Sequence, residues 1–492
     1  MSSAIVLIMM TKSALNITLD RKSATPIYRQ LIAQIRSMIE SGDLPAGARL
    51  PASRSLARQQ DISRISVVNA YSELRGAGLL SSQVGKGTYV ARQTVPSAMP
   101  RSQLPEPSRR APALRHMLRK DRREGIIDFS GGTPPTEFFP VRYLQDAINQ
   151  VIDRDGADAL SYEVAEGYQP LRIAVRDYVR AIGIRCRHQD VLITGGAQQA
   201  IDLVVQSLMK QGETLLTADP TYLGIIDIAQ ARRVRIHGLP VDDQGIRIDA
   251  LERACRDLQP RLIYVMPSYQ NPTGHLMPLH RRRQLVRLAA RLRIPVLEDE
   301  VYREFRFDGE ALPPLKALDE SGVVIHTNAF TKVLLPGVRI GYLVADGAWY
   351  ERLVRVKQAA DISTSGLNQR AIHLLLERGV LGKQLERNRL ELRRRRGAAL
   401  AAAQRHFPAG ASWFSPQGGL YLWAELPAAG PNAADLLQAA LEQGAAFAPG
   451  NQFSTRGGHK HALRLNFGLH PPALIEEGFL RIGEAWRELA EI

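Results

Sequence analysis

Residues 92–125 divide the chain into two parts that we expect to fold separately. This stretch shows little apolar periodicity, and it contains five prolines, Pro96, Pro100, Pro105, Pro107 and Pro112. Such a composition is typical of an extended tether. A flexible chain of this length spans roughly 30–35 Å, and more where proline stiffens it. We therefore expect two folded parts, residues 23–91 and 126–492, joined by a linker that can carry the first part onto a neighbouring subunit.

Composition places the chain among globular proteins. It has 492 residues, of which 45% are hydrophobic, so disorder is excluded as its main state. The apolar run from Ala4 to Met10 is seven residues long and has no basic flank before it, which is too short for a membrane span and poor as a signal peptide. We expect residues 1–22 to be a disordered leader, with Met9 and Met10 as alternative starts.

The two cysteines carry no sign of a structural or metal site. Cys186 and Cys255 are far apart and lack metal-ligand spacing, so the sequence indicates neither a disulfide framework nor a bound metal. Together with the missing membrane span, this pattern predicts a cytoplasmic protein.

Positive charge is concentrated before residue 126. Residues 1–125 hold 20 Lys and Arg against 8 Asp and Glu, a net charge of +12, whereas residues 126–492 hold 44 against 41, a net charge of +3. Such an excess is what binding to a phosphate backbone requires, because each cation near a phosphate releases a condensed counterion. A basic solvated face would give the same totals, so local patterning has to decide.

Apolar spacing in residues 23–91 predicts a helix-turn-helix. Apolar residues recur at helical spacing from Ile27 to Ile39, and Gly42 closes that helix. A short helix is expected after Pro51, and a tight turn ending at Ser63 leads into a helix that runs to about residue 77. The last helix has a core face formed by Val67, Ala70, Tyr71 and Leu74.

The solvent face of that last helix carries polar residues near its N-terminal end. Arg64, Ser66 and Asn69 lie where a recognition helix reads the major groove. Residues 79–90 then predict two short strands around a turn that contains Lys86. Such a hairpin, or wing, would place this cation beside the adjacent phosphates.

The run from Pro26 to Val90 resembles the winged helix of the GntR family along its whole length. The resemblance rests on the pattern SGxLxxGxxLPxxRxLA, followed by SR and GxGTxV. It implies that Arg54, Arg64, Ser66 and Gly87 contact double-stranded DNA, with Lys86 on the wing. A lone arginine on a helix is usually a solvated charge, and it is the complete pattern that favours a DNA contact here.

After residue 126 the pattern changes to an alternation of helices and short apolar strands. We predict strands near residues 191–194, 214–217, 234–237, 261–266, 295–298, 323–327 and 338–345. Amphipathic helices separate most of them, which indicates an α/β fold. Because this architecture supports many chemistries, function has to be argued from particular residues.

Polar clusters follow three of the predicted strands. One strand ends at Glu298 and continues through Asp299 to Tyr302, so an acid and a phenol lie at the end of a buried strand. Another leads into a turn that contains Asn271, and a third leads to Lys332, with Arg339 seven residues later. Each cluster alone has an ordinary structural explanation, a paired acid, a loop or a surface lysine. The conjunction of the three points to a site.

Together these clusters resemble the pyridoxal-phosphate-dependent aminotransferases of fold type I, over essentially all of residues 126–492, and particularly the branch that includes aminoadipate aminotransferases. The resemblance implies that Lys332 forms the Schiff base with the cofactor aldehyde, because a neutral amine is nucleophilic, and later shuttles a proton. It implies that Asp299 pairs with the pyridine nitrogen, and that Asn271 and Tyr302 hydrogen-bond the phenolic oxygen of the ring.

The same resemblance assigns further contacts to the cofactor. The turn that contains Gly196, Ala197 and Gln198 lies between a strand and a helix, so that free N–H groups face the cofactor phosphate. Arg339 would bind the same phosphate. The position three before Lys332, usually a serine in this family, is Ala329, so one hydroxyl contact is expected to be missing and Thr331 is the neighbouring hydroxyl.

Two more positions concern the substrate end of the site. Tyr222 fits the aromatic residue that stacks on the pyridine ring and is counted with the catalytic residues; otherwise it belongs to the core. Arg464 lies in a strand that resembles the one whose arginine binds an α-carboxylate through a bidentate pair. The segment Phe129–Gly132 matches the part of the family that covers the substrate.

A winged helix joined by a linker to such a domain is the organisation of the MocR regulators. The fold expected is therefore a winged helix-turn-helix at residues 23–91, mostly α with a small β wing, and an α/β fold-type-I domain at residues 126–492. The latter divides into a large subdomain, about residues 140–360, and a small one, about residues 361–492. The implied assembly is a homodimer.

The function expected is a DNA-binding transcriptional regulator that senses pyridoxal 5'-phosphate, an amino acid or amine, or both. An active amino-acid aminotransferase that carries a DNA-binding module is the alternative, because the catalytic residues are present. A regulator that senses the cofactor alone is a third possibility. The intact winged helix favours regulation, since a plain transaminase does not need one.

Overall fold

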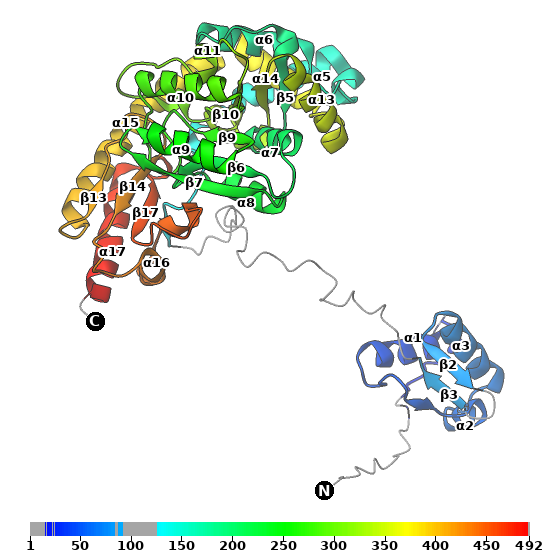
Figure 1. Ribbon diagram of the computed structural model, residues 1–492. Coiled ribbons are helices and arrows are strands. Elements are labelled where there is room, and N and C mark those ends of the chain that lie inside the picture. The colour runs from blue at the N-terminus through cyan, green and yellow to red at the C-terminus, as the bar shows by residue number, and fades with distance from the viewer. Residues whose placement is uncertain are drawn as a thin grey trace. The chain divides into compact units, whose positions relative to one another are not determined.

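The computed structural model describes residues 15, 17–21, 23, 25–83, 87–91 and 125–490 (Figure 1). The chain divides into two compact units, residues 1–107 and 108–492. Lys86 and almost the whole of the expected linker lie outside the described residues.

The first unit has the helix-turn-helix and the two wing strands that the apolar spacing predicts. Its strands form one antiparallel sheet in the order β1-β3-β2. The elements are α1 (Ile27–Glu40), β1 (Arg49–Leu50), α2 (Ser53–Gln59), α3 (Arg64–Gly76), β2 (Leu80–Gln83) and β3 (Gly87–Val90). All four residues expected on the core face of α3 are buried, and Ser63 caps this helix by accepting a hydrogen bond from the Ile65 amide.

Residues 15 and 17–21 belong to this unit, although we expected them in a disordered leader. Leu15 and Ile17 are buried in its core. The amide of Thr18 donates to Gln34 Oε1 at 3.0 Å, and the Gln34 side chain donates back to the Thr18 carbonyl. Side chains of α1 therefore satisfy the backbone of this segment and hold it in place.

The second unit is built on an eight-stranded sheet in the order β5-β12-β11-β10-β9-β6-β7-β8. The pairings from β11 to β7 are parallel, and β12 and β8 run antiparallel to their neighbours. Each strand predicted from the sequence is present. The bounds are β5 (Val191–Thr194), β6 (Thr214–Asp219), β7 (Arg235–Asp242), β8 (Gly245–Ile246), β9 (Leu262–Val265), β10 (Val296–Asp299), β11 (Val324–Ala329) and β12 (Gly341–Val344).

Helices cover both faces of this sheet (Figure 1). Side chains alternate between the faces, so Leu262 and Tyr264 of β9 lie in one core, whereas Ile263 and Val265 lie in the other. The helices of this part are α5 (Val141–Asp155), α6 (Gln169–Ala181), α7 (Ala197–Leu208), α8 (Leu223–Ala231), α9 (Ile248–Leu258), α10 (Leu279–Leu292), α11 (Leu315–Leu318), α12 (Phe330–Val333), α13 (Gly347–Asp361) and α14 (Gly366–Glu377).

A smaller sheet follows the long helix α15 (Val380–His406) in the order β13-β14-β17-β16. Its strands are β13 (Ser412–Trp413), β14 (Tyr421–Glu425), β16 (Ala448–Pro449) and β17 (Ala462–Asn466), and the helices are α16 (Ala433–Glu442) and α17 (Pro472–Ala490). The first strand of the unit, β4 (Ile127–Asp128), pairs with β15 (Ala445–Ala446). Within the described ranges, no helix is both long and apolar enough to cross a membrane.

Candidate functional sites

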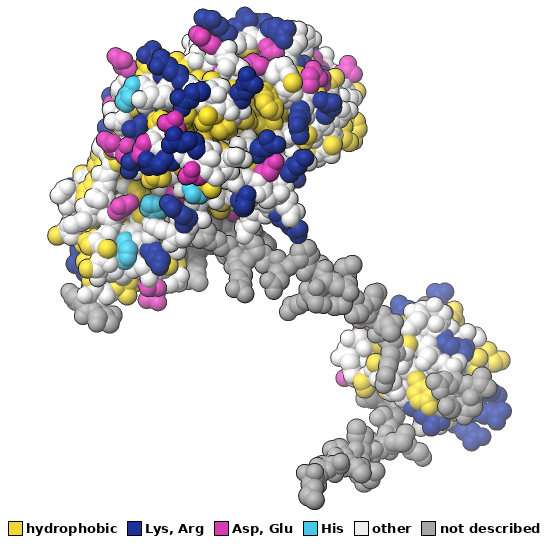
Figure 2. Space-filling model, viewed as in Figure 1, with side chains coloured by type: hydrophobic (Ala, Val, Ile, Leu, Met, Phe, Trp, Pro, Cys, Tyr) yellow, Lys and Arg dark blue, Asp and Glu magenta, His cyan; other side chains and the backbone are white. Residues whose placement is uncertain are grey.

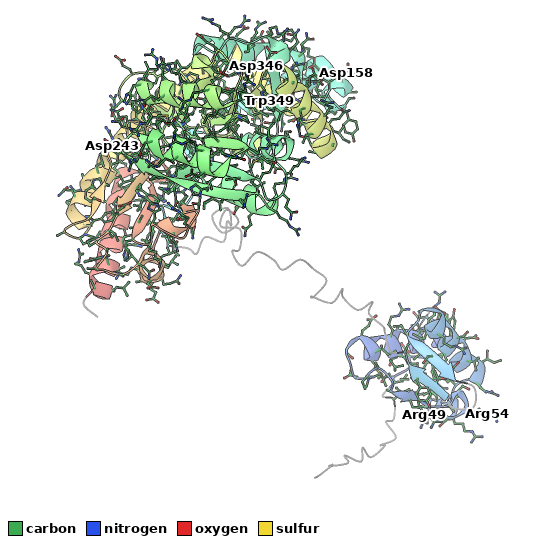
Figure 3. The ribbon with its side chains drawn as sticks, in the orientation of Figure 1. Arg49, Arg54, Asp158, Asp243, Asp346 and Trp349 are labelled. Atoms are coloured by element: carbon green, nitrogen blue, oxygen red, sulfur yellow. The ribbon has the colours of Figure 1, made fainter. Side chains whose placement is uncertain are left out.

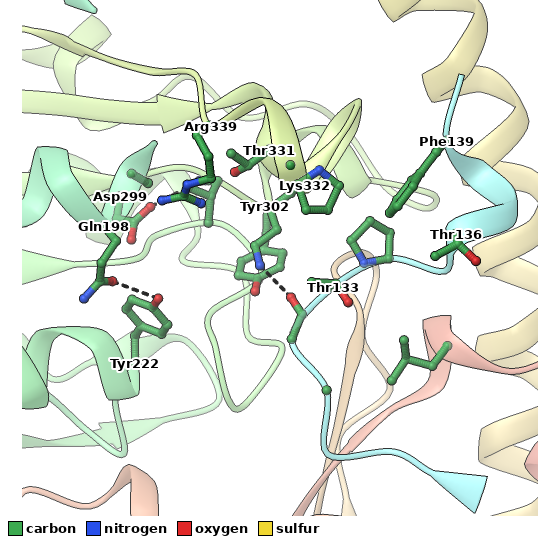
Figure 4. Close-up of a pocket in the computed structure, with 18 of the residues that line it drawn as sticks. Thr133, Thr136, Phe139, Gln198, Tyr222, Asp299, Tyr302, Thr331, Lys332 and Arg339 are labelled. Carbon is green, nitrogen blue, oxygen red and sulfur yellow. Dashed lines mark hydrogen bonds between the residues drawn. The ribbon is translucent and has the colours of Figure 1, made fainter. Parts of the chain in front are cut away.

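A cavity of about 570 Å³ lies at the edge of the large sheet where the parallel strands end (Figure 4). In open α/β sheets this edge is where ligands bind. The cavity brings together most of the residues that the sequence singled out as a cofactor site. Those that line it are Ala197, Gln198, Tyr222, Asp299, Tyr302, Thr331, Lys332 and Arg339.

Lys332 lies in the middle of this cavity, with Asp299 on one side and Phe139 on the other (Figure 4). Its Nζ donates a hydrogen bond of 2.6 Å to the carbonyl of Gly132, in the segment after β4. Burial lowers the pKa of Lys332 to about 8, with a further contribution from the positive charges of Arg464 and Arg339. A neutral, nucleophilic amine is therefore accessible close to physiological pH.

Asp299 is the middle one of three consecutive buried acids, and it differs from its neighbours in its partners. Glu298 pairs with His326 at 2.9 Å, and Glu300 pairs with Arg282 at 3.3 Å. Asp299 accepts from the Tyr264 hydroxyl at 2.7 Å and from a backbone amide. Within the described ranges, Asp299 has no cation as an ion-pair partner. Burial raises its pKa to about 6, so a cationic ligand atom at this position would be strongly favoured.

Gly196 and Arg339 lie together in one corner of the site, where Arg339 lines the cavity. Gly196 precedes α7 with φ +100°, and a Cβ at this position would lie 2.9 Å from Nη2 of Arg339. The first amides of a helix have no partner within the helix, and its dipole favours a negative charge there. Arg339 is exposed and Thr331 lines the cavity, while Ala329 is buried. A phosphate group matches this set of donors.

Two tyrosines along the cavity are held by side chains from other elements. Tyr222 donates to Gln198 Oε1 at 3.0 Å, and Gln198 donates in turn to the carbonyl of Gly224. The hydroxyls of Tyr302 and Tyr421 lie 2.7 Å apart. Burial raises the pKa of both Tyr222 and Tyr302, so both phenols are protonated at neutral pH.

Arg464 and Asn271 lie together beside the cavity, but neither is among the residues that line it. Arg464 is buried in β17 and donates to Asn271 Oδ1 at 3.0 Å and to the carbonyl of Ser130. Its guanidinium lies over the ring of Tyr421, 4.3 Å from the centroid. Asn271 and Ser130 thus hold Arg464, the predicted carboxylate-binding residue, next to Phe129–Gly132, the segment predicted to cover the substrate.

The sequence analysis did not single out Tyr264 and Tyr421, whose hydroxyls contact Asp299 and Tyr302, although neither is among the residues that line the cavity. Each lies inside a strand where an apolar side chain would serve equally well, so no local pattern distinguishes it. Tyr421 meets Tyr302 across 119 positions of the chain, and only the fold brings the two hydroxyls together.

The first unit presents a second candidate site on α2 and α3. Arg54 and Arg64 are exposed, Ser66 is half-buried and Gly87 is exposed. Figure 3 shows Arg49 and Arg54 at the end of the unit where α2 lies, and dark blue Lys and Arg side chains gather there in Figure 2. A Cβ on Gly87, which has φ +117°, would lie 3.1 Å from Nε of Arg49. Arg49 is exposed and lies beside Gly87, a proximity that no motif had indicated.

Comparisons with known proteins match one family to each of the two units of the chain. The family described as "Aminotransferase class I and II" matches residues 124–482, and "Bacterial regulatory proteins, gntR family" matches residues 27–90. The 2-aminoadipate transaminase of Thermus thermophilus is 38% identical over 77% of this chain and 94% of its own.

Relatives whose match covers 81% to 94% of this chain carry regulator names. The "Uncharacterized HTH-type transcriptional regulator YdfD" of Bacillus subtilis is 29% identical over 94% of this chain and 97% of its own. The "Probable rhizopine catabolism regulatory protein MocR" of Rhizobium meliloti is 29% identical over 81% of each chain. Among solved structures, LysN, an α-aminoadipate aminotransferase from Thermus thermophilus complexed with N-(5'-phosphopyridoxyl)-L-leucine, matches with a TM-score of 0.73 and 36% identity. The match covers 77% of this chain and 95% of that one.

Proposed function

Because this chain belongs to the class I and II aminotransferases and carries a gntR-family domain before them, we propose that it is a transcriptional regulator whose aminotransferase-like unit senses an amino compound. One observation carries the proposal: an exposed helix-turn-helix and a lysine-containing cavity are both intact in one chain. An enzyme has no need of the former, and a simple DNA-binding protein has no need of the latter.

The cofactor of this family is pyridoxal 5'-phosphate, and the residues of the cavity fit it. Asp299 is a buried carboxylate without a cationic partner among the described residues. The corner of Gly196 and Arg339 suits a phosphate. When bound, the cofactor supplies an aldehyde that reacts with amines and a ring that withdraws electrons.

With the cofactor bound, Lys332 would offer a neutral amine and move a proton, and Asp299 would hold the ring nitrogen in its protonated form. Arg339, the turn Gly196–Gln198 and Thr331 would hold the phosphate. Asn271 and Tyr302 would hydrogen-bond the phenolic oxygen. Tyr222 packs on the ring. Arg464 would donate hydrogen bonds to the carboxylate of an amino-acid effector, for which its buried guanidinium is suited.

Transamination is the second candidate function, and the pKa of Lys332 favours it. An amine with a pKa of about 8 is suited to take and return a proton at neutral pH. Steady turnover of an amino acid with a 2-oxo acid by the purified chain would support this function, whereas binding without turnover would support a sensor.

We further propose that the chain acts as a homodimer through one end of its second unit. Of the eleven large hydrophobic side chains exposed in the described part of this unit, six lie between residues 141 and 164. They are Val141, Tyr143, Ile152, Leu160, Tyr162 and Val164. A gathering of this kind is typical of an interaction surface, and symmetric dimers are the commonest oligomers.

The proposed function is tested by selecting DNA with the purified full-length chain. Randomised duplexes are enriched over several rounds with and without pyridoxal 5'-phosphate and a mixture of amino acids. We expect one recurrent sequence, bound with an affinity that changes when the amino acids are added. Recovery of no preferred sequence under any of these conditions would contradict the proposal.

A further inference from the structure

Two apolar side chains stand out on the solvent face of α3. Ile65 is 70% exposed and Val68 is 43% exposed. They are the exposed large hydrophobic residues of the described part of the first unit. Both lie in the first two turns of the recognition helix, next to Arg64.

The geometry of the helix explains why these side chains find no cover within the unit. At 3.6 residues per turn, Ile65 points almost directly away from the face formed by Val67, Ala70 and Leu74, which are buried. Val68 is three residues further on and is therefore a neighbour of Ile65 on the surface. The outward face of α3 thus begins with an apolar pair.

The exposed arginines near Ile65 and Val68 favour a polyanion as the partner that this pair contacts. Arg54 and Arg64 are exposed on α2 and α3, and Arg49 lies beside Gly87. Residues 23–91 hold 8 Lys and Arg against 4 Asp and Glu, a net charge of +4, which favours a polyanion over an ordinary protein surface. In the major groove of DNA, the apolar group available for contact is the 5-methyl of thymine.

We propose that Ile65 and Val68 select thymine in the operator by packing on its 5-methyl group. The inference rests on the proposed function, and it adds the chemistry by which this particular helix chooses bases. Arg64 would supply a polar contact to a neighbouring base, and the apolar pair would exclude bases that lack the methyl group.

The test replaces thymine by deoxyuridine, which differs only by the missing methyl group. The selected duplex is made with deoxyuridine at one thymine position at a time, and the Kd of the full-length chain is measured for each duplex. We expect a loss of about three- to tenfold at one or two positions of each half-site, the effect of one buried methyl group, and no change elsewhere.

Protein variants then assign the positions. Ile65→Ala should weaken binding to the thymine duplex and abolish the difference between thymine and deoxyuridine at one position, and Val68→Ala should do so at another. Ser72→Ala, an exposed position further along the same helix, should leave both differences unchanged. Thermal melting of each variant shows that the unit is folded.

Equal affinity for thymine and deoxyuridine at every position would overturn the inference while leaving the proposed function standing. So would an Ile65→Ala variant that loses the same factor on both duplexes, as expected if a protein surface rather than DNA covers the pair. Selection that returns no preferred sequence would overturn the proposed function and this inference with it.

Discussion

Burial controls the chemistry of the two residues on which the cavity depends. Lys332 and Asp299 have pKa values shifted in opposite directions, to about 8 and to about 6, and burial is the largest cause in both cases. Between these values Asp299 is ionised, while a useful fraction of Lys332 is neutral. At the same pH, burial thus makes Lys332 available as a neutral nucleophile and leaves Asp299 charged as a counter-ion for a cationic ring.

Replacement of Lys332 should remove covalent binding of the cofactor without unfolding the chain. Lys332→Ala is expected to lose the visible absorption of the protein-bound cofactor after dialysis, because the residues that line the cavity then include no amine to react with the aldehyde. The control is Lys210→Ala, which changes an exposed lysine outside the cavity. A variant at Lys332 that keeps the absorption band would show that another lysine binds the cofactor.

The rate at which the empty chain captures pyridoxal 5'-phosphate should depend on pH through Lys332. The neutral amine reacts, and its fraction rises about tenfold per pH unit below the pKa and levels off above it. We therefore expect the rate to rise from pH 6 and to reach a plateau near pH 8 to 9. Stopped-flow absorbance measures this profile. A rise that continues to pH 10 or above would indicate an unshifted lysine.

Single site residues were predictable from the sequence where they lie at the end of an apolar strand. Asp299 ends one such strand and Lys332 follows another, and the length and flanks of a strand are local properties of the sequence. The sequence alone could not decide whether Asp299 is paired or catalytic. Its neighbours Glu298 and Glu300 pair with His326 and Arg282, and these pairs depend on which strands and helices meet in the fold. Tyr421 was not predictable, because its partner is remote in the chain.

At the scale of elements, the features of α3 are local in the sequence, whereas the N-terminal segment of the first unit is held by long-range contacts with α1. The beginning of α3 after the turn that ends at Ser63 and its buried face follow from the sequence pattern, whereas the cap formed by the Ser63 side chain was not predicted. The packing of residues 15 and 17–21 on α1 does not follow from the pattern either, since it depends on the side-chain amides of Gln30 and Gln34, which no apolar pattern reveals. The tip of the wing, with Lys86, lies outside the described residues.

Arg64 begins α3 and should contribute to sequence recognition. Arg64→Ala is expected to weaken binding to the selected duplex by roughly 1–3 kcal/mol if it reads a guanine, and to weaken binding to random DNA much less. Lys86→Ala should instead weaken binding to all sequences and reduce the salt slope by about one unit. Arg36→Ala, an exposed arginine on α1, is the control, and fluorescence anisotropy is the measurement. Equal losses on both duplexes for Arg64→Ala would make it a phosphate contact.

At the scale of the whole molecule, the exposed apolar side chains of residues 141–164 predict an assembly. Leu160 and Tyr162 are 68% and 85% exposed, and a charge on either should weaken a dimer that buries them. We expect Leu160→Asp and Tyr162→Asp to shift sedimentation equilibrium toward the monomer, whereas Leu390→Asp, at a 71% exposed residue of α15, should not. A wild-type chain that is monomeric at micromolar concentration would contradict the proposal.

A regulator differs from an enzyme with an attached DNA-binding unit by coupling between its two sites. Thermodynamic linkage requires that, if a ligand changes the affinity for DNA, DNA changes the affinity for the ligand by the same factor. Coupling constants of this kind are typically about 5- to 150-fold. A flexible tether does not transmit force by itself, so coupling between the two units requires contacts that form and break.

The most direct test measures the affinity of the cofactor-loaded chain for amino acids with and without a saturating amount of the selected duplex, and the affinity for that duplex with and without the same amino acid. The account predicts that one amino compound changes both affinities by the same factor, and that Arg464→Ala removes both changes for an amino acid. The account would be contradicted if the duplex left the affinity for every ligand unchanged and if every amino compound bound in the cavity left the affinity for DNA unchanged.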